Sequence, residues 1–302
     1  MKTYGVGFLG SGDISDLHAE GLADMPGAVL RGLWSYDPDL GRKKAERFGC
    51  RNHTTGESLV SDPEIDVIFV LTPMENHIES VKLAVGAGKH VLVEKPVGST
   101  VEEIRAMKDL ADEAGVRIAP VHNYIYESGV MRTREMIDNG AIGDVVSVYV
   151  MYNIHHPEVV AARYPGVVKH IMTHHCYILL YLAGDPQALS CMKSTINDGS
   201  VPRENLAMGT LKMTSGALAH FCASFAADDH AGDPWTCMIK VVGTKGATRF
   251  SYRDWVENTP AVVHSQTYWA YPYSIKRVGD YFINRCLRNG EPPLSSIEDA
   301  IT

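Results

Sequence analysis

The stretch YGVGFLGSGDIS, residues 4–15, decides the fold of the first half of the chain. Residues 4–9 are small or apolar and predict a buried strand, and a helical pattern of apolar residues follows. Gly10 permits a tight turn between them, and Gly12 lets a pyrophosphate approach the backbone at the N-terminus of the helix. Ser15 stands where this fingerprint has its third glycine. The stretch predicts a dinucleotide-binding turn; the alternative is an ordinary glycine turn.

The second predicted strand, residues 29–34, ends at the position that would contact the adenosine ribose. A dinucleotide site has an acid about 20 residues after its glycines. Ser35 best matches that position, and it lacks the carboxylate that would repel a 2′-phosphate. Arg42 in the next helix could supply positive charge. We therefore expect NADP or NAD as cofactor, with NADP slightly favoured; the alternative is that Asp37 binds the ribose.

Strands and helices alternate through the remainder of the first 121 residues. Apolar runs at 66–71 and 91–93 predict further strands, a helix is expected over 101–114, and another strand over 117–122. This alternation predicts a doubly wound parallel sheet, and hence a dinucleotide-binding domain over residues 1–121.

Glu94-Lys95-Pro96 follows the strand at 91–93 directly. Ligands bind at the carboxyl ends of the strands in an open parallel sheet. Pro96 biases Lys95 away from helical backbone angles, so the lysine is held at that edge. Lys95 is a candidate functional group; the alternative is a surface ion pair with Glu94.

The rhythm changes in the second half. A helix is expected over 129–139, and short apolar runs separated by tight turns predict an antiparallel sheet. Those runs lie at residues 144–154, 206–213, 217–224, 236–242 and 247–251. We expect an α+β domain over residues 122–302 with a large, open, mainly antiparallel sheet.

Residues 169–182 read as a buried helix with His170, His174, Tyr177 and Tyr181 on one face. Two histidines four residues apart have metal-ligand spacing. No carboxylate or cysteine cluster completes such a site, so we expect no metal. Other polar groups that could line a substrate cleft together with this helix include Asn123, Tyr124, His155 and Tyr164.

Composition excludes several classes of protein. The 302 residues carry a formal net charge of −8 and no basic cluster, which argues against a nucleic-acid or anionic-membrane partner. The six cysteines are scattered without a C-x-x-C spacing, so a reducing, cytoplasmic location is expected.

These motifs together resemble the Gfo/Idh/MocA oxidoreductases, the relatives of glucose–fructose oxidoreductase and inositol dehydrogenase, over essentially the whole chain. The motifs carrying the resemblance are Gly10-Ser11-Gly12-Asp13-Ile14, Thr72-Pro73 with His77, residues 87–96 ending in Glu94-Lys95-Pro96, residues 137–143, residues 289–293 and Glu298-Asp299-Ala300. The chain stops in what resembles the first turn of the family's final helix, so we expect that helix to be truncated. The resemblance also implies a homodimer or homotetramer formed through the C-terminal sheet.

The resemblance implies roles for individual residues. Lys95 corresponds to the family lysine beside the nicotinamide and the substrate hydroxyl, in a Lys-Pro peptide bond that is often cis. We expect the cofactor to be bound by Gly10, Gly12, Asp13, Ile14, Ser35, Tyr36, Arg42, Thr72, Pro73, His77, Glu94 and Lys95.

One departure from the family pattern concerns the catalytic histidine. The family has Asp-x-x-x-His; His174 matches its histidine, whereas His170 stands in place of its aspartate. An aspartate would fix the tautomer of the histidine, so His170 either does this less well or carries the proton itself. We expect Lys95, His174 and His170 to be catalytic, and these three with Asn123, Tyr124, His155 and Tyr164 to bind substrate.

The expected function is an NAD(P)-dependent dehydrogenase or reductase that acts on a secondary alcohol or ketone of a sugar, inositol or related polyol. Two alternatives remain open. One is an NAD-dependent enzyme that cleaves glycosides through transient oxidation at C3. The other is a non-catalytic dinucleotide-binding sensor.

Overall fold

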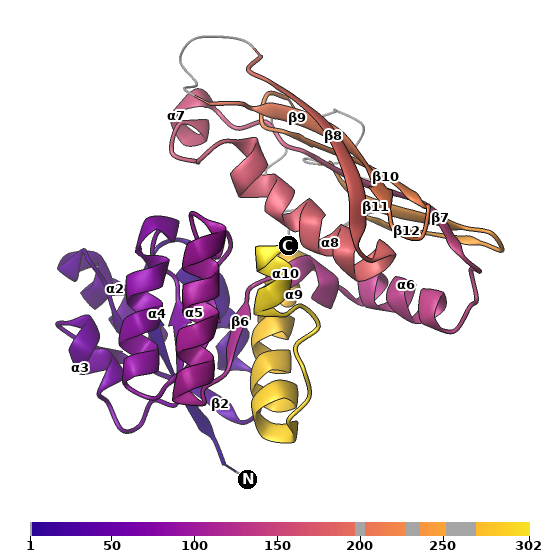
Figure 1. Cartoon of the computed structure of the whole chain (residues 1–302). Helices are drawn as coiled ribbons and strands as arrows, with labels where there is room; N and C mark the ends of the chain where they lie inside the picture. The colour runs from indigo at the N-terminus through magenta and orange to yellow at the C-terminus, as the bar shows by residue number, and fades with distance from the viewer. Residues whose placement is uncertain (1, 197–202, 228–235, 252–269) are drawn as a thin grey trace. The chain divides into compact units, whose positions relative to one another are not determined.

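Figure 1 shows the computed structural model of the chain, which describes residues 2–196, 203–227, 236–251 and 270–302. Contacts within the chain define two compact units. The first comprises Met1–Asn123 with Pro272–Thr302, and the second comprises Tyr124–Tyr271. Each unit contains one six-stranded sheet.

The first unit is built on a parallel sheet with the strand order β3-β2-β1-β4-β5-β6. The chain reverses its direction of travel across the sheet between β1 and β4, which creates the switch point of a doubly wound fold. The expected fold class of this half is confirmed. The strands are β1 (Tyr4–Leu9), β2 (Ala28–Trp34), β3 (Arg51–Asn52), β4 (Val67–Val70), β5 (His90–Val93) and β6 (Ile118–Pro120).

Helices connect these strands, and local sequence sets several of their ends. The carboxylate of Asp37 caps α2 by accepting from two backbone N–H groups, and the hydroxyl of Thr100 caps α5 by accepting from one, that of Glu103. Gly49 and Gly115 end these helices with positive φ angles of 67° and 65°. The connecting segments are α1 (Ile14–Ala23), α2 (Pro38–Phe48), α3 (Gly56–Val60), η1 (Met74–Asn76), α4 (His77–Gly86) and α5 (Val101–Ala114).

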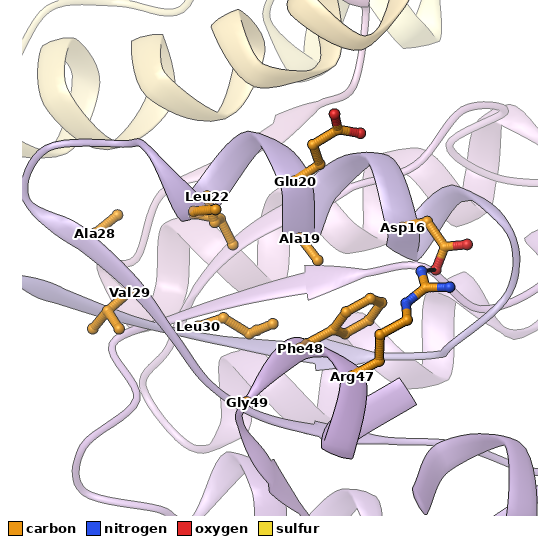
Figure 2. Close-up of a pocket in the computed structure, with 11 residues that line it drawn as sticks. Asp16, Ala19, Glu20, Leu22, Ala28, Val29, Leu30, Arg47, Phe48 and Gly49 are labelled. Carbon is orange, nitrogen blue, oxygen red and sulfur yellow. Dashed lines mark ion pairs between the residues drawn. The ribbon is translucent and has the colours of Figure 1, made fainter. Parts of the chain in front are cut away.

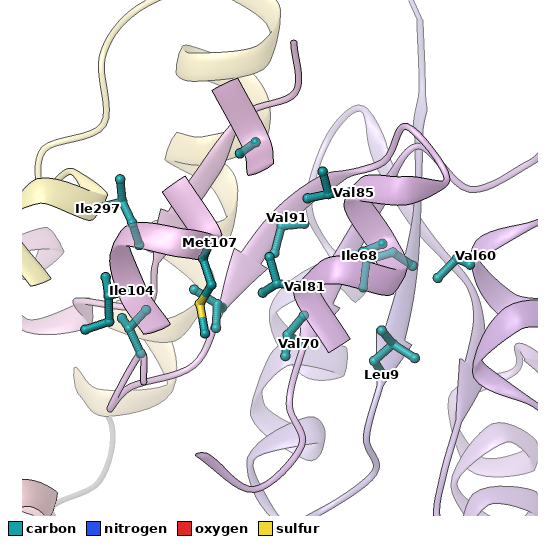
Figure 3. Packing of buried hydrophobic residues seen from close by; sticks show 14 of the residues in the cluster. Leu9, Val60, Ile68, Val70, Val81, Val85, Val91, Ile104, Met107 and Ile297 are labelled. Carbon is teal, nitrogen blue, oxygen red and sulfur yellow. The ribbon is translucent and has the colours of Figure 1, made fainter. Parts of the chain in front are cut away.

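The core on one side of this sheet is formed mainly by Val, Leu and Ile side chains, with Met107 among them (Figure 3). Ile68, Val81, Val91 and Met107 are 0% exposed. Burying each such side chain contributes roughly 1.5–3 kcal/mol. Because helices also cover the sheet, the central strands read as continuous apolar runs rather than as alternating ones.

The C-terminal segment belongs to the first unit, although the expected second domain included it. Arg288 donates to the carbonyl of Lys2 at 2.9 Å, and Ile297 joins the aliphatic core. We therefore propose domain limits that follow the compact units. Such long-range packing leaves no local signal in the sequence. This segment forms α9 (Ala270–Asp280), the π-helical η5 (Tyr281–Leu287) and α10 (Ile297–Ile301).

The second unit is built on a mixed sheet with the strand order β12-β11-β7-β10-β9-β8. Among the described strands of this second sheet, only β7 and β10 pair in parallel. The expected, mainly antiparallel sheet is thus confirmed. Its strands are β7 (Val145–Asn153), β8 (Pro186–Ser194), β9 (Leu206–Met213), β10 (Leu218–Ser224), β11 (Thr236–Gly243) and β12 (Ala247–Ser251).

Helices of the second unit lie along one face of this sheet, as α6 and α8 show in Figure 1. The strand register places Tyr149, Met192, Met208 and Leu218 on the opposite face, where they are between 39% and 82% exposed. The non-strand elements are η2 (Asn123–Tyr126, which spans the unit boundary), α6 (Ser128–Asp138), α7 (Glu158–Ala161), η3 (Val168–Met172) and α8 (Thr173–Ala183).

Two features of this unit were not expected. Strand β8 begins at a proline and every one of its residues is exposed, so it lacks the apolar alternation that identifies a strand. The helix expected over residues 169–182 is interrupted: Val168–Met172 is π-helical, and the α-helix begins only at Thr173. A π-helical turn contains more residues, so His170 and His174 do not share a regular α-helical face.

Candidate active site

The glycine turn of the first unit leaves backbone accessible at the start of α1. Gly10 has a φ of 108°, and a Cβ there would lie 2.6 Å from the carbonyl of Leu71, so only glycine fits. Gly12 is exposed, and a Cβ there would meet no atom within 4 Å. Asp13, also exposed, precedes α1 without a side-chain hydrogen bond that caps the helix. The turn therefore fits the phosphates of a dinucleotide, because uncapped N–H groups and the helix dipole favour an anion.

The two candidates for ribose contact at the end of β2, Ser35 and Asp37, have different hydrogen-bond partners. The Ser35 hydroxyl accepts from Ser11 at 2.6 Å and from the Asp37 backbone N–H at 3.2 Å. The carboxylate of Asp37 accepts from two N–H groups at the start of α2, both at 3.0 Å, and is committed to that cap. Arg42 pairs with Asp39 on the surface at 2.9 Å, and Tyr36 is 61% exposed.

His77 lies inside the protein and joins two loops at the carboxyl edge of the sheet. Its Nε2 lies 2.8 Å from the Thr72 carbonyl oxygen, and its Nδ1 lies 3.1 Å from that of Val97. The ring is 1% exposed. His77 thus connects the loop of Thr72 and Pro73, after β4, with the segment that follows Pro96, and we expect it to shape these loops rather than to contact a cofactor.

Lys95 follows β5 at the same edge, in a cis peptide bond with Pro96, as the family resemblance implied. Its backbone N–H donates to Glu94 Oε2 at 3.0 Å. Glu94 is 7% exposed, and its other oxygen lies 2.9 Å from Nε2 of His18. Burial lowers the pKa of the Lys95 ammonium, and the Glu94 carboxylate opposes this shift. Both oxygens of Glu94 are thus engaged within the protein.

His174, in the second unit, lies in an aromatic enclosure at the start of α8. It is 4% exposed, and its Nδ1 lies 2.6 Å from the hydroxyl of Tyr177. The same hydroxyl accepts from the backbone N–H of Tyr124 at 3.2 Å, and the Tyr124 ring meets the imidazole edge-on at 4.7 Å. Tyr177 is therefore the partner of Nδ1 in this protein.

His170 has different neighbours. Its ring stacks on Tyr164 with centroids 3.9 Å apart, and His156 and Phe225 complete an aromatic cluster. His155 is exposed, with Nδ1 at 3.3 Å from the Ala226 carbonyl oxygen.

Asn123 belongs to the first unit, and its side-chain amide donates to Ser274 at 2.8 Å. It is 1% exposed, as is Tyr124. We expect both residues to support the structure around the site rather than to present polar groups to a substrate.

A pocket of about 470 Å³ lies elsewhere on the first unit, between α1, β2 and the end of α2 (Figure 2). At its rim Asp16 forms ion pairs with Lys44 and Arg47. Burial raises the pKa of Asp16, but the hydrogen bonds from Arg47 and Lys44 outweigh it, and the pKa lies below its usual value. The pocket includes neither the glycine turn nor Ser35. It is lined by Asp16, Ala19, Glu20, Leu22, Ala23, Ala28, Val29, Leu30, Arg47, Phe48 and Gly49.

In the part of the chain that the structure describes, no three His, Cys, Asp or Glu side chains gather closely enough to hold a metal ion. No helix there has the length and apolar character that crossing a bilayer requires.

A doubly wound sheet with an accessible glycine turn at its switch point defines a dinucleotide-binding protein. Comparison with known proteins agrees. Residues 4–122 match the oxidoreductase family with an NAD-binding Rossmann fold, and residues 130–249 match the Gfo/Idh/MocA C-terminal domain. The chain belongs to the Gfo/Idh/MocA oxidoreductase family.

Individual relatives are more distant. Levoglucosan dehydrogenase of Pseudarthrobacter phenanthrenivorans is 29% identical over 214 residues, which are 65% of this chain and 55% of that protein. The NADP(+)-dependent scyllo-inositol 2-dehydrogenase IolW of Bacillus subtilis is 32% identical over 140 residues, 44% of this chain and 39% of the relative. These alignments span about half the length of the relatives or less.

The fold agrees over nearly full length with solved structures. The crystal structure of GenD2 from gentamicin A biosynthesis, in complex with NAD, has a TM-score of 0.85 and 22% identity. The match covers 100% of this chain and 91% of that one.

The sequence did not single out His18, although a signal was present. Ser15, His18 and Leu22 lie on the buried face of α1. A histidine in an apolar stripe needs a buried polar partner, because an unpaired polar group there is costly. That partner, Glu94, is 76 residues away in the sequence and could not be identified from it.

Proposed function

We propose that this protein is an NAD(P)-dependent dehydrogenase or reductase that acts on a secondary alcohol or ketone of a sugar, inositol or related polyol. The observation that carries the proposal is the position of Lys95. It follows β5 at the carboxyl edge of the sheet whose glycine turn fits a dinucleotide, and its backbone is fixed there by Glu94. The named relatives, which act on levoglucosan and scyllo-inositol, support this class of substrate.

The proposed cofactor site uses the turn at Gly10, Gly12, Asp13 and Ile14 for the phosphates and the region of Ser35, Tyr36 and Arg42 for the adenosine end. The loop of Thr72 and Pro73 and the Glu94-Lys95 segment border the nicotinamide end, with His77 supporting both loops. A bound dinucleotide supplies C4 of its nicotinamide as the hydride acceptor or donor.

The adenosine end favours NADP slightly over NAD. Position 35 carries no carboxylate, and Oδ1 of Asp37 is directed at the N–H groups that begin α2 rather than at a ribose. The cationic partner of such a phosphate would be Arg42, once released from its weak surface pair with Asp39.

The protein itself moves the proton. The Lys95 ammonium donates a hydrogen bond to the substrate oxygen and stabilises the negative charge that develops on it. His174 takes the hydroxyl proton on Nε2 during oxidation and returns it during reduction. For Nε2 to accept, the ring proton has to be on Nδ1, where it donates to the Tyr177 oxygen. In this tautomer the Tyr177 oxygen accepts from Nδ1 and holds the ring in place, and His170 binds substrate beside Tyr164. His155 is a further proposed substrate contact.

The experiment is a titration with NADPH and NADH followed by turnover assays on a panel of polyols, anhydrosugars and keto-sugars, read at the nicotinamide absorbance. Binding with turnover of one panel member is expected. Binding without turnover of any member would instead support a sensor. Cleavage of an aryl glycoside without net reduction of the cofactor would indicate the glycoside-cleaving alternative.

The exposed apolar face of the second sheet supports the expected homodimer or homotetramer. Tyr149, Met192, Met208 and Leu218 form a surface of the kind that marks protein–protein contacts. We propose that this face joins copies of the chain in the cytoplasm. Light scattering of Met208→Glu should show a smaller assembly than the wild type, and an unchanged mass would contradict the proposal.

A further inference from the structure

A buried hydrogen bond links the helix of the glycine turn to the residue before Lys95. His18, on α1, and Glu94, directly after β5, are 2% and 7% exposed. Nε2 of His18 lies 2.9 Å from Oε1 of Glu94. A carboxylate only accepts hydrogen bonds, so Nε2 carries a proton and donates it. The other oxygen, Oε2, accepts from the Lys95 backbone N–H at 3.0 Å.

Aromatic packing fixes the imidazole in the orientation that reaches Glu94. The rings of Phe8, on β1, and Phe69, on β4, meet it edge-on at centroid distances of 6.3 and 5.3 Å. The two strands are neighbours at the switch point of the sheet. The ring is therefore held by the sheet itself, and its polar contact is directed at Glu94.

We propose that His18 is a positioning residue: its N–H fixes the Glu94 carboxylate, which in turn fixes the backbone of Lys95 and places a negative charge beside its ammonium. This role rests on the proposed function, in which Lys95 polarises the substrate oxygen. The chain of contacts runs from α1 through His18 and Glu94 to Lys95, so the helix that carries the glycine turn also sets the position of the lysine.

The contact between His18 and Glu94 affects the protonation of Lys95. Burial lowers the pKa of Lys95, and the Glu94 carboxylate is the charge that counteracts it. A Coulombic effect depends on the distance between the two charges. Without His18, the Glu94 carboxylate would no longer be held near the ammonium, so it would counteract burial less and Lys95 would lose its proton at lower pH.

Two substitutions separate the hydrogen bond from the packing of the ring. His18→Gln places an amide N–H near the position of Nε2 and keeps the donor. His18→Phe keeps an aromatic ring between Phe8 and Phe69 and removes the donor. His18→Met, of similar size and without a donor, replaces the Phe variant if that protein does not fold, as judged by thermal unfolding.

The primary readout does not require turnover. Competitive acetylation of the lysines over a pH series, followed by peptide mass spectrometry, gives the pH at which Lys95 is half reactive. We expect His18→Phe to lower that pH by at least about half a unit and His18→Gln to leave it within about 0.2 units. Lys89, whose ammonium donates to the carbonyls of Asp62 and Ile65, is the internal control and should not change.

Turnover gives the second readout once a substrate is found. We expect His18→Phe to lower kcat about tenfold or more, with the Kd of the dinucleotide nearly unchanged and the rate largely restored in His18→Gln. Equal behaviour of the two variants, or a Lys95 profile unchanged in His18→Phe, would overturn the positioning role. If no substrate is turned over at all, the proposed function fails, while the acetylation profile still decides whether His18 controls Lys95.

Discussion

Lys95 in the first unit and His174 in the second unit are held in place by different kinds of contact. The position of Lys95 follows from the backbone: it succeeds a buried strand, and its N–H is bound by the neighbouring carboxylate. The position of His174 depends on side chains, namely the hydroxyl of Tyr177 and the ring of Tyr124. Lys95 is thus supported through Glu94 and, behind it, His18, whereas His174 is held directly by its aromatic neighbours. In both units, changes at supporting residues should therefore lower turnover less than removal of the working group itself.

The largest effect is expected when the working group itself is removed. Lys95→Met should lower kcat by about a thousandfold, because the developing charge on the substrate oxygen loses its stabilising cation. The dinucleotide Kd, measured by nicotinamide fluorescence, should change little. Lys82→Met is the matched control, since Lys82 pairs only with Glu79 among the described side chains near it. Near-normal turnover in Lys95→Met would remove the lysine from the mechanism.

Acid should destabilise both units, because each contains a buried histidine. Burial lowers the pKa of His122, in the first unit, to about 3. Burial also lowers that of His175, in the second unit, to about 4, although its contacts with two carbonyl groups oppose the shift. The unfolded chain binds protons at these sites below about pH 6.5, so stability is fully present above that value and is lost as the pH falls toward the folded pKa values.

Each of the two histidines should cost about 2 kcal/mol of unfolding free energy between pH 7.5 and pH 5. Denaturant unfolding at the two pH values measures the change. His122→Asn retains a group that can bond Ser295, the partner of Nδ1 at 2.6 Å, and should reduce the pH dependence by about 2 kcal/mol. A full pH dependence in that variant would show that His122 does not contribute.

A negative charge added at the end of β2 tests whether the adenosine ribose of the cofactor binds there. Ser35→Asp should raise the Kd for NADPH about tenfold, because the new carboxylate repels a 2′-phosphate, and should change the Kd for NADH less. Calorimetric titration with both cofactors gives the ratio. Ser35→Ala removes the hydroxyl without adding charge and is the control. An unchanged ratio in Ser35→Asp would place the 2′ position elsewhere.

The smallest effect is expected at the supporting residues of the second unit, and it decides which histidine works. Tyr177→Phe should lower kcat about fivefold to tenfold, since it removes the oxygen that holds the His174 tautomer. His170→Phe keeps a ring against Tyr164 and should mainly raise KM. Initial rates over a range of substrate concentration separate the two parameters. A larger loss of kcat in His170→Phe would assign the proton to His170.

The difference between the two units also explains which features could be predicted from the sequence. Buried strands and the glycine turn are local patterns, so the parallel sheet and Lys95 at its edge could be predicted. The His18–Glu94 contact spans 76 residues and leaves no local pattern. In the second unit, the sequence indicated His174 as a candidate catalytic residue, but it did not indicate that His174 pairs with Tyr177. The π-helical turn at Val168–Met172 shifts the side-chain positions that a regular α-helix would give, and no local sequence pattern predicts it.

Strand β8 has a consequence for the motions of the second unit. It lies at the edge of the sheet, and all nine of its residues are exposed. Within a single copy of the chain little apolar burial opposes its release, whereas β7 lies between β10 and β11 and carries the buried Val148 and Val150. Amide hydrogens that bond β8 to β9 should therefore exchange with solvent by local opening, long before those of β7, which require the sheet to unfold. The sheet should open from its β8 edge inward.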